Sequence, residues 1–217
     1  MIDSNAAGVV KSILESIEVP PSSYETARAR YKNLGEWFSR PESACAAYNP
    51  HIYSQGSFRL GTAVRPITKD GEYDLDVGCR LRSGITTFTH TQQFLKSLVG
   101  LEMARYREAR QIKAPLEEKR RCWRLAYADQ LSFHLDLVPS IPAMEALRKS
   151  LSEGMTAEGL DLALVGAVAA YAGSITDNVD PAFAVVSPSW RVSNSEGFAL
   201  WFESRMRIAA RLLQERA

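Results

Sequence analysis

Apolar residues recur every three or four positions through much of the chain, which is the spacing of one face of an α-helix. Pro20-Pro21 ends the first such pattern, and Pro41 ends the second, which begins near residue 22. The apolar positions of the first pattern are Val9, Val10, Ile13, Leu14 and Ile17. Further helical patterns span about 91–109, 143–152, 157–173 and 195–216. The last of these is expected to bury Phe198, Trp201, Phe202 and Met206.

Other segments alternate between apolar and polar residues, which is the period of a half-buried β-strand. The alternation is clear in "DLDVGCRLR" at 74–82 and in "SFHLDLV" at 132–138, so these segments are predicted to be neighbouring strands. "CWRLAY" at 122–127 is a third candidate, and "HIYSQGS" after Pro50 indicates a short strand that enters a turn. Helices precede, interrupt and follow these strands. The pattern therefore predicts an α/β or α+β fold, with a mixed β-sheet flanked by helices.

Three acids fall on one face of the two predicted neighbouring strands. Side chains two apart on a strand point the same way, so Asp74 and Asp76 project together and Asp136 can turn toward them. Carboxylates that lie a few ångströms apart repel one another unless a cation neutralises them. Oxygen-rich sites of this kind suit Mg²⁺ or Mn²⁺. The competing interpretation is a solvated strand edge, which is the commoner role of an isolated Asp-x-Asp.

The segment before the acids has the composition of a phosphate-binding turn. Gly56 permits close approach of a backbone, Ser57 offers a hydroxyl and an amide, and a short helix would follow. Arg59 and Arg65 add positive charge nearby. Gly-Ser is common in ordinary loops, so the prediction depends on the order of turn, acid pair and distant strand aspartate.

The composition of the chain excludes several classes of function. The 217 residues are 46% hydrophobic and 24% charged, which is ordinary for a globular protein of one large or two small domains. The net charge of +1 gives no overall attraction to nucleic acid or to an anionic membrane, so nucleic-acid binding is not expected. The three cysteines and three histidines lack zinc-ligand spacing, and the N-terminus does not resemble a signal peptide. A protein of the reducing cytoplasm is expected.

The motifs together resemble one family. "GS" followed by Asp-x-Asp and a later strand aspartate resembles the polymerase-β-like nucleotidyltransferases. The fuller string "QGSFRLGTAVRP...DGEYDLDVGCRL...CWRLAY...FHLDLVPSIP...SPSWRVSNSEGFALWF" resembles the bacterial cGAS/DncV-like nucleotidyltransferases, or CD-NTases. These enzymes make cyclic-oligonucleotide signals in anti-phage defence (CBASS). The resemblance runs from about residue 24 onward.

The resemblance implies a metal-dependent reaction. Asp74 and Asp76 match the family's acids that hold two Mg²⁺ ions, with Mn²⁺ as the substitute, and Asp136 matches the third acid, which helps to position the attacking hydroxyl. Nucleoside triphosphates such as ATP or GTP are the implied substrates. A 3′- or 2′-hydroxyl of one nucleotide would attack the α-phosphate of another and release pyrophosphate, and the product would act on a downstream effector.

The resemblance also implies contacts to the nucleotide. Gly56 and Ser57 match the phosphate-binding turn, and Gln55 is an extra phosphate or sugar contact. Ser193 and Asn194 cap the last predicted helix, and in the family this segment lies beside the nucleotide pocket, so both are candidate contacts.

Two further features have competing interpretations. His134 shares a face with Asp136, where a catalytic base and a hydrogen-bonded structural histidine are both conceivable. The basic run "EEKRRCWR" at 117–124 is either a nucleic-acid patch or a solvated strand edge with one face at the rim of the active site. The second interpretation is preferred for the run.

The expected organisation is one catalytic core over 1–217, with the helices of 1–41 packed on it. The helix of 195–217 would lead toward a C-terminal helical lobe, which family members have and which this sequence lacks or finds on a separate subunit. Weak nucleotide affinity and low or absent activity are therefore expected of the chain alone. The alternatives are a nucleotidyltransferase that modifies a small molecule, protein or RNA end, and a degenerate nucleotide-binding regulatory module.

Overall fold

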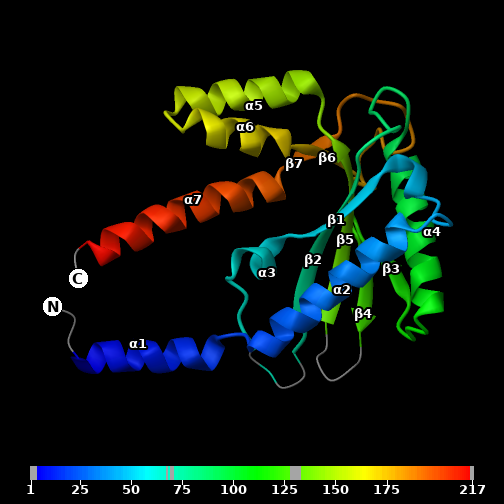
Figure 1. The fold of residues 1–217 in the computed structure, drawn as a ribbon. Coiled ribbons are helices and arrows are strands. Elements are labelled where there is room, and N and C mark those ends of the chain that lie inside the picture. The colour runs from blue at the N-terminus through cyan, green and yellow to red at the C-terminus, as the bar shows by residue number, and fades with distance from the viewer. Residues whose placement is uncertain (1–3, 67, 69–70, 128–132, 216–217) are drawn as a thin grey trace.

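A twisted mixed sheet forms the centre of the molecule (Figure 1). The computed structural model describes residues 4–66, 68, 71–127 and 133–215. Its main strand order is β1-β2-β5-β4-β3, in which β2 and β5 are parallel and the other pairs antiparallel. These strands are β1 (Pro50–Ser54), β2 (Tyr73–Leu81), β3 (Leu116–Glu118), β4 (Trp123–Tyr127) and β5 (Phe133–Pro142). The end of β5 also pairs with β6 (Gly173–Ile175), which pairs with β7 (Arg191–Ser193).

Helices flank this sheet, so the predicted fold class is confirmed. The long ones are α1 (Ser4–Ile17), α2 (Pro21–Ser39), α4 (Gln92–Ala109) and α7 (Ser195–Gln214). The shorter ones are α3 (Gly56–Leu60), the 3₁₀ turn η1 (Ala46–Tyr48), α5 (Glu145–Ala157) and α6 (Leu162–Ala170). None of the helices in the described part of the chain combines the length and apolar character that a membrane crossing would need.

One face of the sheet carries the core. Leu75 and Val77 of β2 and Leu135 and Leu137 of β5 are fully buried there, as the alternating pattern predicts. The apolar faces of α2 and α4 cover them with Leu34, Phe38, Leu95, Val99 and Met103. The acids of the same strands therefore occupy the opposite face.

Close packing at two glycines fixes neighbouring elements. A Cβ on Gly78 of β2 would lie 2.2 Å from the Tyr53 ring of β1. A Cβ on Gly100 of α4 would lie 2.3 Å from the Trp123 ring of β4, whose indole nitrogen donates to the Lys96 carbonyl oxygen at 2.9 Å. A larger residue at either position would push the helix or strand away.

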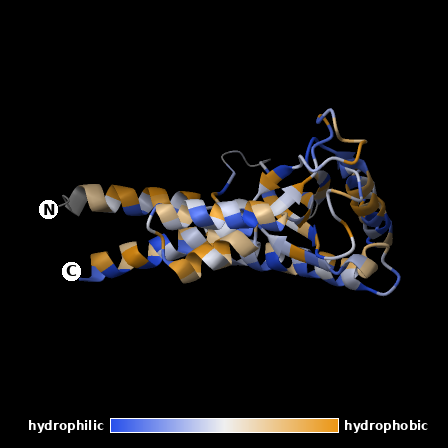
Figure 2. Ribbon diagram, turned by 90° about the horizontal axis from the view of Figure 1, so that it is seen from above, coloured by the Kyte–Doolittle hydropathy of each residue, from blue (hydrophilic) through white to orange (hydrophobic). Residues whose placement is uncertain are grey.

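The N-terminal helix departs from the expected packing. α2 packs on β1, but the apolar side chains of α1 are 40–56% exposed, and α1 extends away from the sheet (Figures 1 and 2). Its end is held by the bridge between Glu18 and Val64 and by the Arg65 amide, which donates to the Ile17 carbonyl oxygen. The expectation that 1–41 packs on the core is therefore wrong for α1. Residues 1–3 lie outside the described part.

The last helix also buries less than its pattern predicts. Phe198, Trp201 and Met206 of α7 are exposed, whereas Gly197 and Ala199 are its buried residues. The fully buried side of α7 thus carries small residues, Phe202 is half-buried, and Phe198, Trp201 and Met206 are exposed. Residues 216–217 of the predicted 195–217 helix, and residue 132 of the predicted strand, lie outside the described part.

Candidate active site

The three predicted acids lie on adjacent parallel strands. In the register of β2 and β5, Asp76 is directly opposite Asp136, and Asp74 is opposite His134. Alternation along each strand turns these side chains to the face opposite the core. The exposed fraction of the side chain is 69% for Asp74 and 16% for Asp136. The sheet therefore brings together one open and two partly covered carboxylates.

Asp76 sits against the predicted phosphate turn. The Gln55 amide donates to the Asp76 carbonyl oxygen at 2.9 Å, which fastens the end of β1 to β2. Gly56 follows with a φ of +65°, and a Cβ there would lie 2.1 Å from Asp76 Oδ2. The glycine is needed both for its backbone angle and for this close approach. The turn and the acid thus form one structural unit.

Asp76 lies in a partly buried environment with a second and a third carboxylate nearby. Burial, followed by the carboxylates of Asp136 and Asp74, raises the pKa of Asp76 above its usual value, while Arg124 acts in the opposite direction. A divalent cation would relieve this repulsion.

Arg124 of β4 is the main partner of Asp136. Its Nε donates to Asp136 Oδ1 at 2.7 Å and its Nη2 donates to Asp136 Oδ2 at 2.8 Å. Nη2 also lies 3.8 Å from Asp74 Oδ1. Sequence reasoning placed one face of 117–124 at the rim of the site but did not single out Arg124. The cross-strand pairing of Arg124 with Asp136 depends on strand register, which the sequence alone does not give.

A second pair borders the acids. His134 Nε2 contacts a carboxylate oxygen of Glu72, and His134 Nδ1 lies 3.9 Å from Asp74 Oδ1. Contact with Glu72 supports the structural interpretation of His134. Glu72 has the same strand parity as the two predicted acids, which is the sequence signal that could have found it.

Cys122 lies beside this cluster without adding a reactive group. Burial and then the Asp136 carboxylate raise the pKa of the Cys122 thiol to about 12, so the thiol stays protonated at neutral pH.

The donor set fits a hard divalent cation. Carboxylate oxygens from Asp74, Asp76 and Asp136 are the ligands that Mg²⁺ and Mn²⁺ prefer. Within the described residues, no group of three or more acids, histidines or cysteines is already arranged around a metal position. Arg124 donates to both carboxylate oxygens of Asp136 in this arrangement.

The remaining predicted contacts separate into two groups. Gln55 stays next to the turn, where its Oε1 accepts a hydrogen bond from Ser195 Oγ at 2.7 Å and so connects the turn to the start of α7. Ser193, at the end of β7, is close in sequence to that contact. Asn194 is used structurally, because its Oδ1 accepts from the Gly197 amide and its Nδ2 donates to the Val168 carbonyl oxygen.

Arg59 is directed elsewhere. Its guanidinium pairs with Glu203 of α7, so it joins α3 to the last helix. The structure does not bring Arg59 together with the three acids.

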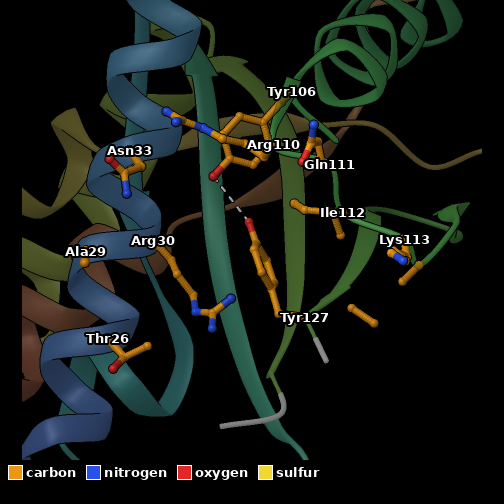
Figure 3. A pocket seen from close by; sticks show the side chains of 12 residues that line it. Thr26, Ala29, Arg30, Asn33, Tyr106, Arg110, Gln111, Ile112, Lys113 and Tyr127 are labelled. Carbon is orange, nitrogen blue, oxygen red and sulfur yellow. Dashed lines mark hydrogen bonds between the residues drawn. The ribbon is translucent and has the colours of Figure 1, made fainter. Parts of the chain in front are cut away.

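One cavity lies away from the acids. It measures about 670 Å³ and opens between α2, the segment after α4, and β4 (Figure 3). Arg30 lies over the Tyr127 ring, at 3.9 Å from the ring centre, and Tyr127 donates to the Tyr106 hydroxyl at 3.4 Å. Tyr127 pairs with Phe133 and shares its strand face, so this cavity is on the core side of the sheet. It is not the site of the acid chemistry.

Comparison with known proteins finds relatives in sequence and in fold. Residues 50–139 match the family described as Cyclic GMP-AMP synthase DncV-like, nucleotidyltransferase domain. That range contains the turn, all three acids and Arg124. A c-di-GMP synthase from Roseivirga ehrenbergii is 29% identical over 143 residues, which are 64% of this chain and 36% of that protein.

Solved structures show the same fold. The CD-NTase CdnG from Bradyrhizobium diazoefficiens, in complex with GTP, aligns with a TM-score of 0.64 and 22% identity, over 92% of this chain and 47% of that one. The Vibrio cholerae DncV cyclic AMP-GMP synthase, with the linear intermediate 5′ pppA(3′,5′)pG, aligns with a TM-score of 0.56 and 14% identity. That alignment covers 88% of this chain and 59% of DncV. The chain thus spans about a third to three fifths of the length of these relatives.

The motif match, the curated relative and the fold agree with one another. Residues 50–139 match the DncV-like nucleotidyltransferase domain, and the chain resembles the bacterial CD-NTases in sequence and in fold.

Proposed function

We propose that this protein is a metal-dependent nucleotidyltransferase that joins nucleoside triphosphates into a cyclic oligonucleotide, with release of pyrophosphate. The observation that carries the proposal is the placement of Asp76 between Asp136 on the neighbouring strand and the Gly56 turn. Phosphoryl transfer depends mainly on positioning and charge neutralisation, and this arrangement supplies the groups for both. Anti-phage signalling of the CBASS type, through an effector that receives the product, is the biological role we infer from the family.

Each part of the site has a proposed task. Asp74, Asp76 and Asp136 hold two Mg²⁺ ions, or Mn²⁺, and these ions would neutralise the charge that develops on the attacking and leaving oxygens. The Gly56–Ser57 turn binds the phosphates of the triphosphate through the serine hydroxyl and backbone amides. Asp136 also orients the attacking hydroxyl and accepts its proton.

The substrates are proposed to be ATP, GTP or both. The support comes from the relatives, because the CdnG structure contains GTP and the DncV structure contains a linear A–G intermediate. Gln55 and Ser193 are the proposed sugar or phosphate contacts at the edge of the turn. Because both polar atoms of Asn194 are held by the backbone, we propose only a positioning role for it, and Arg59 is assigned the same role through Glu203.

A helical lobe, on the same polypeptide or on a second subunit, is proposed to complete the nucleotide cleft. The relatives are longer than this chain, and the apolar side chains of α1 and of α7 are exposed on the side where both helices extend beyond the sheet (Figure 2). A cytoplasmic location is part of the same proposal, because nucleoside triphosphates are its substrates.

Substitution of Asp76 tests the proposed catalytic role of the three acids. Asp76→Asn removes a carboxylate that no neighbour replaces, so pyrophosphate release from mixed NTPs with Mg²⁺ should fall by more than about 10²-fold. Substitution of a residue that only supports a metal ligand already causes a loss of up to about that size. Circular dichroism and urea unfolding should show an intact fold. Glu153→Gln on α5 is the matched control, because Glu153 is exposed and pairs only with Lys149 at 3.9 Å.

The products distinguish the alternatives. A phosphatase-resistant cyclic product from radiolabelled NTPs supports the proposal, whereas label on an added RNA, protein or small molecule supports a modifying enzyme. Mg²⁺-dependent binding of a non-hydrolysable NTP without turnover supports a regulatory nucleotide-binding module. Near-wild-type pyrophosphate release by the Asp76→Asn variant would contradict the metal assignment.

A further inference from the structure

Arg124 occupies the position of a cation in the acid cluster. Its guanidinium makes a two-pronged contact with Asp136, at 2.7 and 2.8 Å, and approaches Asp74 to 3.8 Å. It is therefore shared between two of the three carboxylates that are proposed to hold metal ions. Arginine suits such a position because its planar fork matches a carboxylate with two parallel hydrogen bonds.

The cluster needs this charge when no metal is bound. Asp74, Asp76 and Asp136 would otherwise be three carboxylates on two adjacent strands, where like charges repel one another. Within the described residues, the ion pairs of Asp136 involve Arg124 alone. A single positive group thus offsets only part of the negative charge.

The surroundings of Arg124 fix its backbone but leave its side chain partly exposed to solvent. β4 is paired with β5 over Trp123–Tyr127, and the Trp123 ring is packed against Gly100 of α4. The Arg124 side chain is 29% exposed, so its guanidinium can leave the carboxylates without unpacking the core. Strand position and exposure together permit two positions for one side chain.

We propose that Arg124 is a built-in counter-cation that competes with the divalent metal ions for Asp136. In the metal-free protein, the guanidinium neutralises and orients the carboxylate. Binding of the cation requires the Arg124–Asp136 contact to open, so the pair weakens metal affinity in the absence of nucleotide. The inference rests on the proposed function, because it assumes that Asp136 is a metal ligand.

The test is Mn²⁺ binding by the 217-residue chain without nucleotide. Arg124→Met removes the competing charge and keeps much of the side-chain volume. The dissociation constant for Mn²⁺, measured by electron paramagnetic resonance of the free ion at low salt, should decrease by about tenfold or more, the size expected for a charge-assisted pair at a partly exposed site. The same variant should have a lower Tm without Mn²⁺ and a larger rise in Tm when Mn²⁺ is added.

Two control variants separate local competition from general charge. Arg121→Met removes a positive charge from the same hairpin, but Arg121 pairs with Asp177, so its Mn²⁺ affinity should stay within about twofold of the wild type. Arg124→Lys keeps the charge and loses the fork, so its affinity should lie between those of the wild type and Arg124→Met.

The outcomes separate the inference from the proposed function. Unchanged or weaker Mn²⁺ binding by Arg124→Met overturns the inference, and NTP turnover by the wild type would then leave the proposed function standing. Tighter binding by Arg124→Met without any NTP turnover supports the inference and contradicts turnover by this chain alone. If neither protein binds Mn²⁺ at millimolar concentration, both fail.

Discussion

Gly56 is the first residue of the short helix α3 and Gly61 follows its last residue, and both have left-handed backbone angles, with φ of +65° and +69°. They differ in their surroundings. A Cβ on Gly56 would collide with the carboxylate of Asp76, whereas a Cβ on Gly61 would meet no atom within 4 Å. The pair therefore separates the cost of backbone strain from the cost of displacing the Asp76 carboxylate.

Gly61→Ala should lower the free energy of unfolding by about 1 kcal/mol, because only the left-handed conformation is penalised. Gly56→Ala should cost more, about 2–3 kcal/mol, because Asp76 must also move. Urea unfolding measures both, and Mn²⁺ affinity should fall for Gly56→Ala alone. Equal losses of stability and unchanged affinity in the two variants would mean that Asp76 is not held against the turn.

The sequence predicted the individual acids but not their partners. Alternation along β2 and β5 was sufficient to place Asp74, Asp76 and Asp136 on one face. The contact of Arg124 with Asp136 could not be predicted from the sequence, because it depends on which strand lies next to β5 and in what register. Side-chain parity is a local property, whereas pairing between strands is decided by the packing of the whole sheet.

At the scale of elements, one buried carboxylate connects three segments. Asp177, which follows β6, accepts hydrogen bonds from the Nε atoms of Arg120 at 2.8 Å and Arg121 at 3.2 Å, and contacts Arg191 of β7 at 2.7 Å. Its backbone amide donates to Gln92 Oε1 at 2.7 Å. The turn between β3 and β4, the start of α4 and the strand β7 are thereby fixed to one side chain.

Asp177→Asn should lower the free energy of unfolding by about 2–3 kcal/mol at neutral pH. This is less than the cost of breaking a fully buried ion pair, because the three arginines that contact Asp177 are about half exposed to solvent. Hydrogen bonding from Arg120 and the other donors holds the pKa of Asp177 well below its usual value. Because the folded pKa is the lower one, this stabilisation is complete above about pH 4–5 and is lost as the pH falls below about 4.

Urea unfolding of wild type and variant between pH 7 and pH 3 measures this difference. The gap in unfolding free energy should be constant from pH 7 to 5 and should narrow in acid. A gap that widens in acid would show that the carboxylate is not stabilised as an anion in the folded state. Glu153→Gln, on an exposed helix face, should change stability by less than about 0.5 kcal/mol throughout.

The long periodic elements were predictable, and the short ones were not. The segments 74–82, 122–127 and 91–109 correspond to β2, β4 and α4 within one or two residues. The three-residue strands β6 and β7 carry too few positions to show a period, and Gly173 of β6 was included in the preceding helix. These strands exist because the end of β5 offers a free edge beyond β4.

At the scale of the whole molecule, α1 should contribute little to stability. Its apolar residues stay largely in contact with water, and its attachment to the domain involves few groups. A chain that begins at residue 18 should therefore unfold in urea with a free energy within about 1 kcal/mol of the full chain.

The comparison for this prediction is Leu34→Ala in α2. Leu34 is fully buried against the sheet, so its truncation should cost about 2–5 kcal/mol. Hydrogen exchange provides a second measurement, in which the amides of α1 should exchange much faster than those of β2 and β5. A loss of several kcal/mol on removal of 1–17 would show that α1 packs on the domain in solution.

The sequence by itself determined the fold class, the main strands and the three acids with their turn, because these follow from period and parity within single segments. Tertiary structure decided which side chains meet. Arg124 contacts Asp136, and Glu72 contacts His134. The Asn194 side chain bonds to the backbone, and Arg59 pairs with Glu203. The physical reason is that a contact between distant segments depends on strand order, register and helix placement. The apolar faces of α1 and α7 show the same limit, because a periodic pattern indicates that a helix needs a partner surface but does not say which surface covers it.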